Sequence, residues 1–154
     1  MKVTILLASM LFLVGCSAKP EYLKLHSQGE LPKADVALVK PLAYILVNEI
    51  DGVKTTINPS GPGLLITEYE LEFIPGPHSI KVTYNDGVFV NYVDIELRAT
   101  LEAGKKYIIN PMTPKKFWWS RSGEPWKPTL IDVTNRPECW TLKAETTSSI
   151  KDCR

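Results

Sequence analysis

The segment His78-Ser79-Ile80-Lys81-Val82-Thr83-Tyr84 alternates between polar and apolar side chains. In an extended strand its apolar side chains would share one face and its polar side chains the other. This period of two predicts a β-strand with one buried and one solvated face. The following Asn85-Asp86-Gly87 is typical of a hairpin turn, because glycine adopts positive φ without strain.

Segments of strand length lie on both sides of this one. They are Val36–Val39, Ala43–Val47, Val53–Ile57, Leu64–Phe73, Val88–Leu97, Ala99–Glu102 and Lys106–Asn110. Turn sequences such as Asp51-Gly52 separate them, and no stretch before residue 130 shows helical periodicity over three turns. The pattern predicts an all-β fold, an antiparallel β-sandwich of six to eight short strands with an irregular C-terminal extension.

Two blocks within these strands resemble PEGA and transthyretin-like domains of small bacterial surface lipoproteins. They are Phe73–Val82, with its Pro75-Gly76-Pro77-His78 turn, and Leu101–Ile108, with its Ala103-Gly104-Lys105-Lys106-Tyr107 turn. The resemblance covers about residues 36–110. It implies a sandwich that serves as a binding or structural module, and it carries no catalytic site.

The N-terminus has the form of an export signal. Lys2 precedes an apolar run of twelve residues, Val3–Val14, whereas a membrane-spanning helix needs about 20. The run ends in Leu13-Val14-Gly15-Cys16, which resembles the lipobox of bacterial lipoproteins. The resemblance implies that residues 1–15 are a signal peptide and that a diacylglycerol is attached to the thiol of Cys16. The alternatives are an ordinary secretory signal and an uncleaved anchor.

A lipid on Cys16 would place the protein in the cell envelope, with the membrane as its first partner. Ser17 follows the cysteine in place of an aspartate, which by the same resemblance implies the outer membrane in a Gram-negative cell. The polar composition of the next residues predicts a lipidated N-terminus and tether over residues 16–33. Residues 34–154 would then form a single domain.

Acylation of Cys16 would leave an even number of cysteines, Cys139 and Cys153. In an exported protein such a pair normally forms a disulfide. Neither a C-x-x-C spacing nor a neighbouring histidine indicates a reactive thiol pair. We therefore expect a structural disulfide that ties the C-terminal segment down.

Tryptophans are concentrated in one part of the chain. Trp118, Trp119 and Trp126 lie close together in the sequence, and Arg121 lies among them. An exposed aromatic platform of this kind could bind a glycan or an envelope protein. The alternative is that these rings pack against the sandwich and form part of its core.

Charge and motifs exclude several functions. The 18 basic and 17 acidic residues balance, which argues against a nucleic-acid partner. The sequence contains no recognised catalytic motif and only His26 and His78, so neither a metal site nor another cofactor is expected. The alternating acids Glu68, Glu70 and Glu72 are interpreted as a solvated strand face, and Asp132 as a lone acid in a strand.

These observations predict a non-catalytic binding or accessory module of the cell envelope. One alternative is a structural subunit of an envelope assembly. A cell-wall hydrolase is less favoured, because it would need two convergent carboxyl groups or a group with a shifted pKa.

Overall fold

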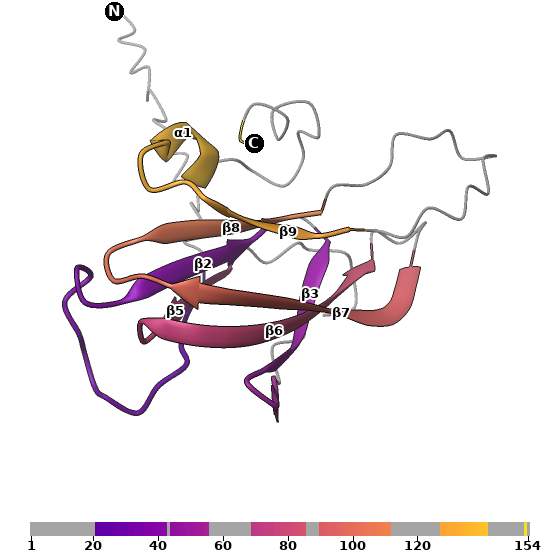
Figure 1. The fold of residues 1–154 in the computed structure, drawn as a ribbon, viewed down its shortest axis with the longest axis horizontal. Helices are drawn as coiled ribbons and strands as arrows, with labels where there is room; N and C mark the ends of the chain where they lie inside the picture. The colour runs from indigo at the N-terminus through magenta and orange to yellow at the C-terminus, as the bar shows by residue number, and fades with distance from the viewer. Residues whose placement is uncertain are drawn as a thin grey trace, which may run out of the picture.

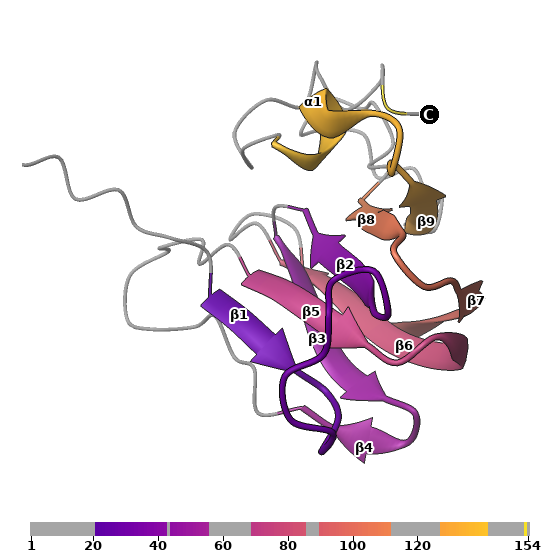
Figure 2. The same ribbon diagram turned by 90° about the vertical axis from the view of Figure 1, so that its left-hand side faces the viewer.

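The computed structural model describes residues 21–42, 44–55, 69–85, 90–111, 127–141 and 153, and these residues form an all-β fold. Two sheets pack face to face (Figures 1 and 2), one with strand order β1-β5-β2-β8-β9 and the other with order β4-β3-β6-β7. The elements are β1 (Glu21–Lys24), β2 (Ala37–Pro41), β3 (Ile45–Ile50), β4 (Val53–Lys54), β5 (Tyr69–Phe73), β6 (Gly76–Asn85), β7 (Val90–Leu101), β8 (Lys106–Asn110), β9 (Thr129–Asp132) and the helical turn α1 (Pro137–Trp140).

The four-stranded sheet is built around the alternating segment, which forms β6 as predicted. β6 pairs antiparallel with β3 on one side and with β7 on the other. The predicted turn at Asp51-Gly52 joins β3 to β4, with φ values of 50° and 82°. Such left-handed conformations at both positions suit a tight two-residue hairpin.

The five-stranded sheet is mixed, whereas an antiparallel sandwich was predicted. β2 runs parallel to β8, and β1 runs parallel to β5, while the remaining pairs are antiparallel. β2 is central and buried along its whole length. A strand covered on both faces has a continuous apolar sequence, as Val36–Val39 does, and this sequence carries no information on the direction of its neighbours.

The main core lies between the two sheets. Side chains of alternate residues meet there, with Leu71 and Phe73 from one sheet facing Val47, Ile80 and Val82 from the other. All five are almost completely buried. The period of two along β5 and β6 therefore supplies the inner faces of the sandwich.

The fold begins earlier than predicted, because part of the expected tether is a strand. β1 lies at the edge of the five-stranded sheet, and the backbone N–H of Leu25 donates to the carbonyl oxygen of Glu72 at 3.1 Å. Leu23 and Leu25 pack on the main core. Their spacing of two places both side chains on one face of an extended chain. The assignment of residues 16–33 to a tether is therefore wrong from Glu21 onward, and the domain starts before residue 34.

Candidate functional site

Most residues predicted to carry function lie outside the described part of the chain. Cys16 belongs to this group, as do Trp118, Trp119, Arg121 and Trp126. Lipidation and the aromatic platform therefore stay predictions. The described residues do include the cysteine pair and several polar clusters that the sandwich builds.

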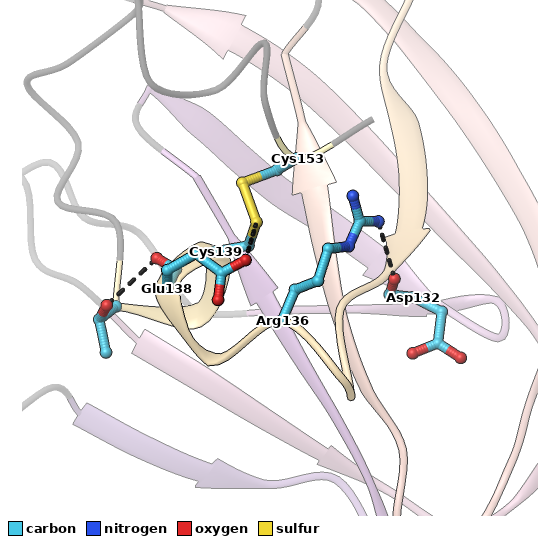
Figure 3. Close-up of a disulfide and its surroundings, with 6 residues drawn as sticks. Asp132, Arg136, Glu138, Cys139 and Cys153 are labelled. Atoms are coloured by element: carbon cyan, nitrogen blue, oxygen red, sulfur yellow. Dashed lines mark hydrogen bonds between the residues drawn. A yellow bond between two sulfur atoms is a disulfide. The ribbon is translucent and has the colours of Figure 1, made fainter.

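The structure joins Cys139 to Cys153 in a disulfide, as the cysteine count predicts (Figure 3), with a Cα–Cα distance of 5.7 Å. Cys139 lies on α1, and both cysteines are buried in a second apolar cluster with Leu42, Ile108 and Val133. This cluster lies on the outer face of the five-stranded sheet, so α1 and Cys153 form a packed cap over part of that face.

Basic side chains of the sheet lie beneath this cap. The Nζ atom of Lys106 lies 5.2 Å from the centroid of the Trp140 ring, a cation–π geometry. The Nζ atom of the buried Lys40 donates to the carbonyl oxygen of Trp140 at 3.2 Å. The positive charges of β2 and β8 are thus matched by groups of α1.

A polar cluster of Tyr22, His26 and Glu72 joins the N-terminal strand to β5, and its histidine and glutamate side chains are buried. The Nε2 atom of His26 lies 2.7 Å from Oε1 of Glu72, and the hydroxyl of Tyr22 donates to the other carboxylate oxygen. The side chain of Glu72 is only 3% exposed. The prediction of a solvated acidic face is therefore wrong at Glu72, because the chain after β1 folds back over this end of β5.

The hydrogen bonds of this cluster assign its protons. The backbone N–H of Gln28 points to Nδ1 of His26 at 3.3 Å, so Nδ1 is the acceptor. The ring proton then lies on Nε2 and is donated to Glu72. Both oxygens of the carboxylate accept hydrogen bonds, as a buried charge requires. We call Tyr22, His26 and Glu72 the N-terminal clamp.

The outer face of the four-stranded sheet carries a second polar cluster. Lys81 on β6 lies 2.5 Å from Glu49 on β3, and this hydrogen bond raises the pKa of Lys81. On β7, hydrogen bonds from Arg98 and then Ser79 lower the pKa of Glu96. These groups are partly or fully exposed and paired, which is typical of a solvated sheet face.

Asp51, His78 and Ser79 lie next to one another but lack the geometry of a hydrolytic triad. The Nδ1 atom of His78 contacts Asp51 at 2.6 Å, and its Nε2 atom contacts the carbonyl oxygen of Ile74 at 2.7 Å. The Ser79 hydroxyl donates to Glu96 at 2.6 Å. The histidine is therefore not placed to take the proton of this serine.

Asp132, predicted as a lone acid, has partners at the end of β9. Burial acts to raise its pKa, but hydrogen bonds from the side chain and backbone of Thr134 and from Lys105 outweigh burial and lower it. Its Oδ1 atom accepts from the Thr134 backbone N–H at 2.9 Å. This arrangement closes the turn before α1.

Within the residues that the structure describes, no group of three histidine, cysteine or acidic residues is placed to bind a metal ion. The same residues include no helix of the length and apolarity needed to cross a bilayer. Comparison with protein-family models, curated proteins and solved structures gives no match to this chain.

The N-terminal clamp was not predicted from the sequence. The alternation of Leu23 and Leu25 is the signal that could have indicated β1, because it places two apolar side chains on one face. Nothing in the sequence pairs His26 with a glutamate 46 positions away. Among the described residues, the N-terminal clamp is the polar cluster nearest in sequence to the predicted lipidation site. The strands β8 and β9 flank the predicted aromatic platform.

Proposed function

We propose that this protein is a lipid-anchored lipoprotein of the cell envelope whose β-sandwich acts as a non-catalytic binding or accessory module. The anchor is the acylated thiol of Cys16, and signal peptidase removes residues 1–15. One observation carries the proposal beyond the lipobox resemblance: β1, the first described strand of the sandwich, begins at Glu21, five residues after the predicted lipidation site.

This spacing keeps the domain close to the bilayer. Five residues span at most about 16–18 Å when fully extended. The interfacial region of each leaflet is itself about 5–8 Å thick. The strand β1 can therefore move at most about 1 nm above the headgroups, so the sandwich would act on partners at the membrane surface.

The N-terminal clamp makes this attachment mechanically firm. β1 is a short edge strand, and such strands separate readily from a sheet. Parallel pairing with β5 and the buried contact between His26 and Glu72 hold it in place. Tension on the lipid is thus transmitted to the core of the sandwich.

The aromatic segment supplies the binding part of the proposal. Trp118, Trp119 and Trp126, with Arg121, would form a platform for a glycan or for a protein of the envelope. The segment connects β8 to β9, the two strands at one edge of the five-stranded sheet. Any platform on it would be carried by the sandwich near the membrane.

The test uses the full chain expressed in a Gram-negative host. Intact mass of the membrane fraction should show a protein that begins at Cys16 and carries acyl chains. Cys16→Ser should give an unacylated, uncleaved precursor, while the control Ser17→Ala should be acylated as the wild type is. An exported wild-type chain with a free thiol at Cys16 would overturn the proposal.

The same preparation tests the membrane of residence. Ser17→Asp should move the acylated protein from the outer-membrane fraction to the inner-membrane fraction on a sucrose gradient. Unchanged sedimentation of this variant would contradict the outer-membrane assignment and leave the lipid anchor intact.

A further inference from the structure

The strand β7 forms one edge of the four-stranded sheet. It pairs with β6 on one side, and no described strand pairs with its other side. β7 lies on the opposite side of the sandwich from β1 (Figure 2). A strand edge to which no described strand pairs is a template for pairing with another strand, and the proposed membrane attachment at β1 does not cover it.

Backbone geometry defines which groups face outward. The backbone N–H of Ser79 donates to Asp51 and its carbonyl oxygen accepts from the Asp51 N–H, so both groups of Ser79 point toward β3. Antiparallel strands alternate, and Arg98 is paired with Ser79. The backbone groups of Arg98, and by alternation those of Glu96 and Thr100, therefore point away from β6.

A register shift limits the usable edge. Val82 pairs with Ile95, but Tyr84 pairs with Asn91, so β7 contains a bulge between these positions. Bulges bend a strand and interrupt its ladder. The regular part of the edge is Ile95–Leu101.

We propose that this edge pairs with the same edge of a second copy of the chain, antiparallel and centred on Leu97. The two four-stranded sheets would then join into one continuous sheet with two-fold symmetry. In this register Glu96 lies opposite Arg98 of the second copy, and Arg98 lies opposite Glu96 of the second copy. Opposite charges in facing positions stabilise antiparallel pairs.

Charge selects this register over its neighbours. Outward-pointing backbone groups must face one another, so the strands can shift only in steps that keep Glu96, Arg98 and Thr100 in matching positions. Centring on Glu96 would place two glutamates opposite each other. Centring on Arg98 would do the same for two arginines. Within the regular part of the edge, only the register centred on Leu97 forms two complementary pairs and places no like charges opposite each other.

The inner face of β7 supports the same register. Ile95, Leu97 and Ala99 pack on the main core but remain only partly buried, because the sheet ends beside them. Pairing would place Leu97 opposite Leu97 and Ile95 opposite Ala99 of the second copy. The apolar core would thus continue across the symmetry axis, and the acids and arginines would remain on the solvated face.

Cysteine cross-linking in membranes of cells that express the full chain tests the proposal. In the centred register, the two Leu97 positions form a non-hydrogen-bonded pair with Cα atoms about 4.5 Å apart, within the range of disulfides. Leu97→Cys should form a disulfide-linked dimer under mild oxidation, roughly tenfold faster than random collision allows. The control is Val53→Cys, whose parent side chain is 69% exposed on β4, away from the β7 edge.

Charge reversal in the Leu97→Cys background tests the register. Glu96→Arg and Arg98→Glu, introduced separately, should each slow cross-linking, because like charges then face each other. The double variant should restore it. Equal rates for Leu97→Cys and Val53→Cys, no rescue in the double variant, or a cross-link to a chain of different mass would each overturn the proposal.

Discussion

The Nε2 atom of His26 lies 2.7 Å from the Oε1 atom of Glu72, and both side chains are almost fully buried. Removal of the His26 imidazole leaves the buried carboxylate of Glu72 without one of its hydrogen bonds. We expect His26→Ala to lower the free energy of unfolding by about 3 kcal/mol, measured by urea denaturation.

The exposed ion pair of Lys24 and Glu30 is the matched control in the same region. The carboxylate of Glu30 is 95% exposed, so Glu30→Ala should cost at most about 1 kcal/mol. Equal effects of His26→Ala and Glu30→Ala would show that the N-terminal clamp contributes no more than a surface contact.

The disulfide between Cys139 and Cys153 should stabilise the cap more than the sandwich. The cysteines are 14 positions apart, and a closed loop of this size contributes about 3 kcal/mol in the chain-entropy account. In the double variant Cys139→Ser/Cys153→Ser, hydrogen exchange should accelerate in α1 and remain slow in β6. Uniform acceleration across both elements would mean that the cap and the sandwich unfold as one unit.

The strands could be predicted from the sequence where a single face is buried. β6 shows this well, because the alternation along the strand directly reports its two environments. The direction of β2 could not be predicted, since a strand buried on both faces has no alternation to read. The burial of Glu72 depends on contacts with β1 and His26, which are remote in sequence, so local charge alternation gave the wrong environment.

The candidate site, like the fold, could be predicted from the sequence only in part. The Cys139–Cys153 pair could be inferred from parity and compartment alone, without knowledge of the fold. The pairing of Lys106 and Lys40 with Trp140 depends on α1 crossing two strands, and no spacing in the sequence encodes that crossing. Sequence therefore indicates covalent features better than buried polar networks.

Tyr69 should make stability depend on alkaline pH. Burial raises the pKa of Tyr69 to about 12, and a hydrogen bond with the backbone of Val47 partly opposes this effect. The unfolded chain loses this proton near pH 10, so the contribution is complete below pH 10 and is lost as the pH rises toward 12. Over this window Tyr69 should account for a loss of about 2–3 kcal/mol.

Thermal unfolding of wild type and Tyr69→Phe between pH 9 and pH 12 measures this contribution. The melting temperature of the wild type should fall more steeply with pH than that of Tyr69→Phe. Parallel curves would show that Tyr69 does not retain its proton in the folded protein.

Trp118→Ala and Trp119→Ala distinguish a binding platform from core packing. If the rings form a platform, each substitution should weaken binding to isolated cell-wall glycan or to a cross-linkable envelope protein and leave the melting temperature within about 2 °C. A large fall in melting temperature with binding intact would assign these rings to the core. Trp126→Ala and Arg121→Ala, measured in the same way, would define the extent of the surface.

The distance between Cys16 and Glu21 should control the height of the domain above the bilayer. A fluorophore on Lys24→Cys, at the end of β1, should be quenched strongly by nitroxides on lipid headgroups. Insertion of about 20 Gly/Ser residues between Pro20 and Glu21 adds a chain with a mean span of about 25 Å, so quenching should fall while acylation persists. The Cys16→Ser protein carrying the same label sets the unquenched baseline. Equal quenching with and without the insertion would mean that the domain adheres to the membrane by its own surface, and the short link would then have no mechanical role.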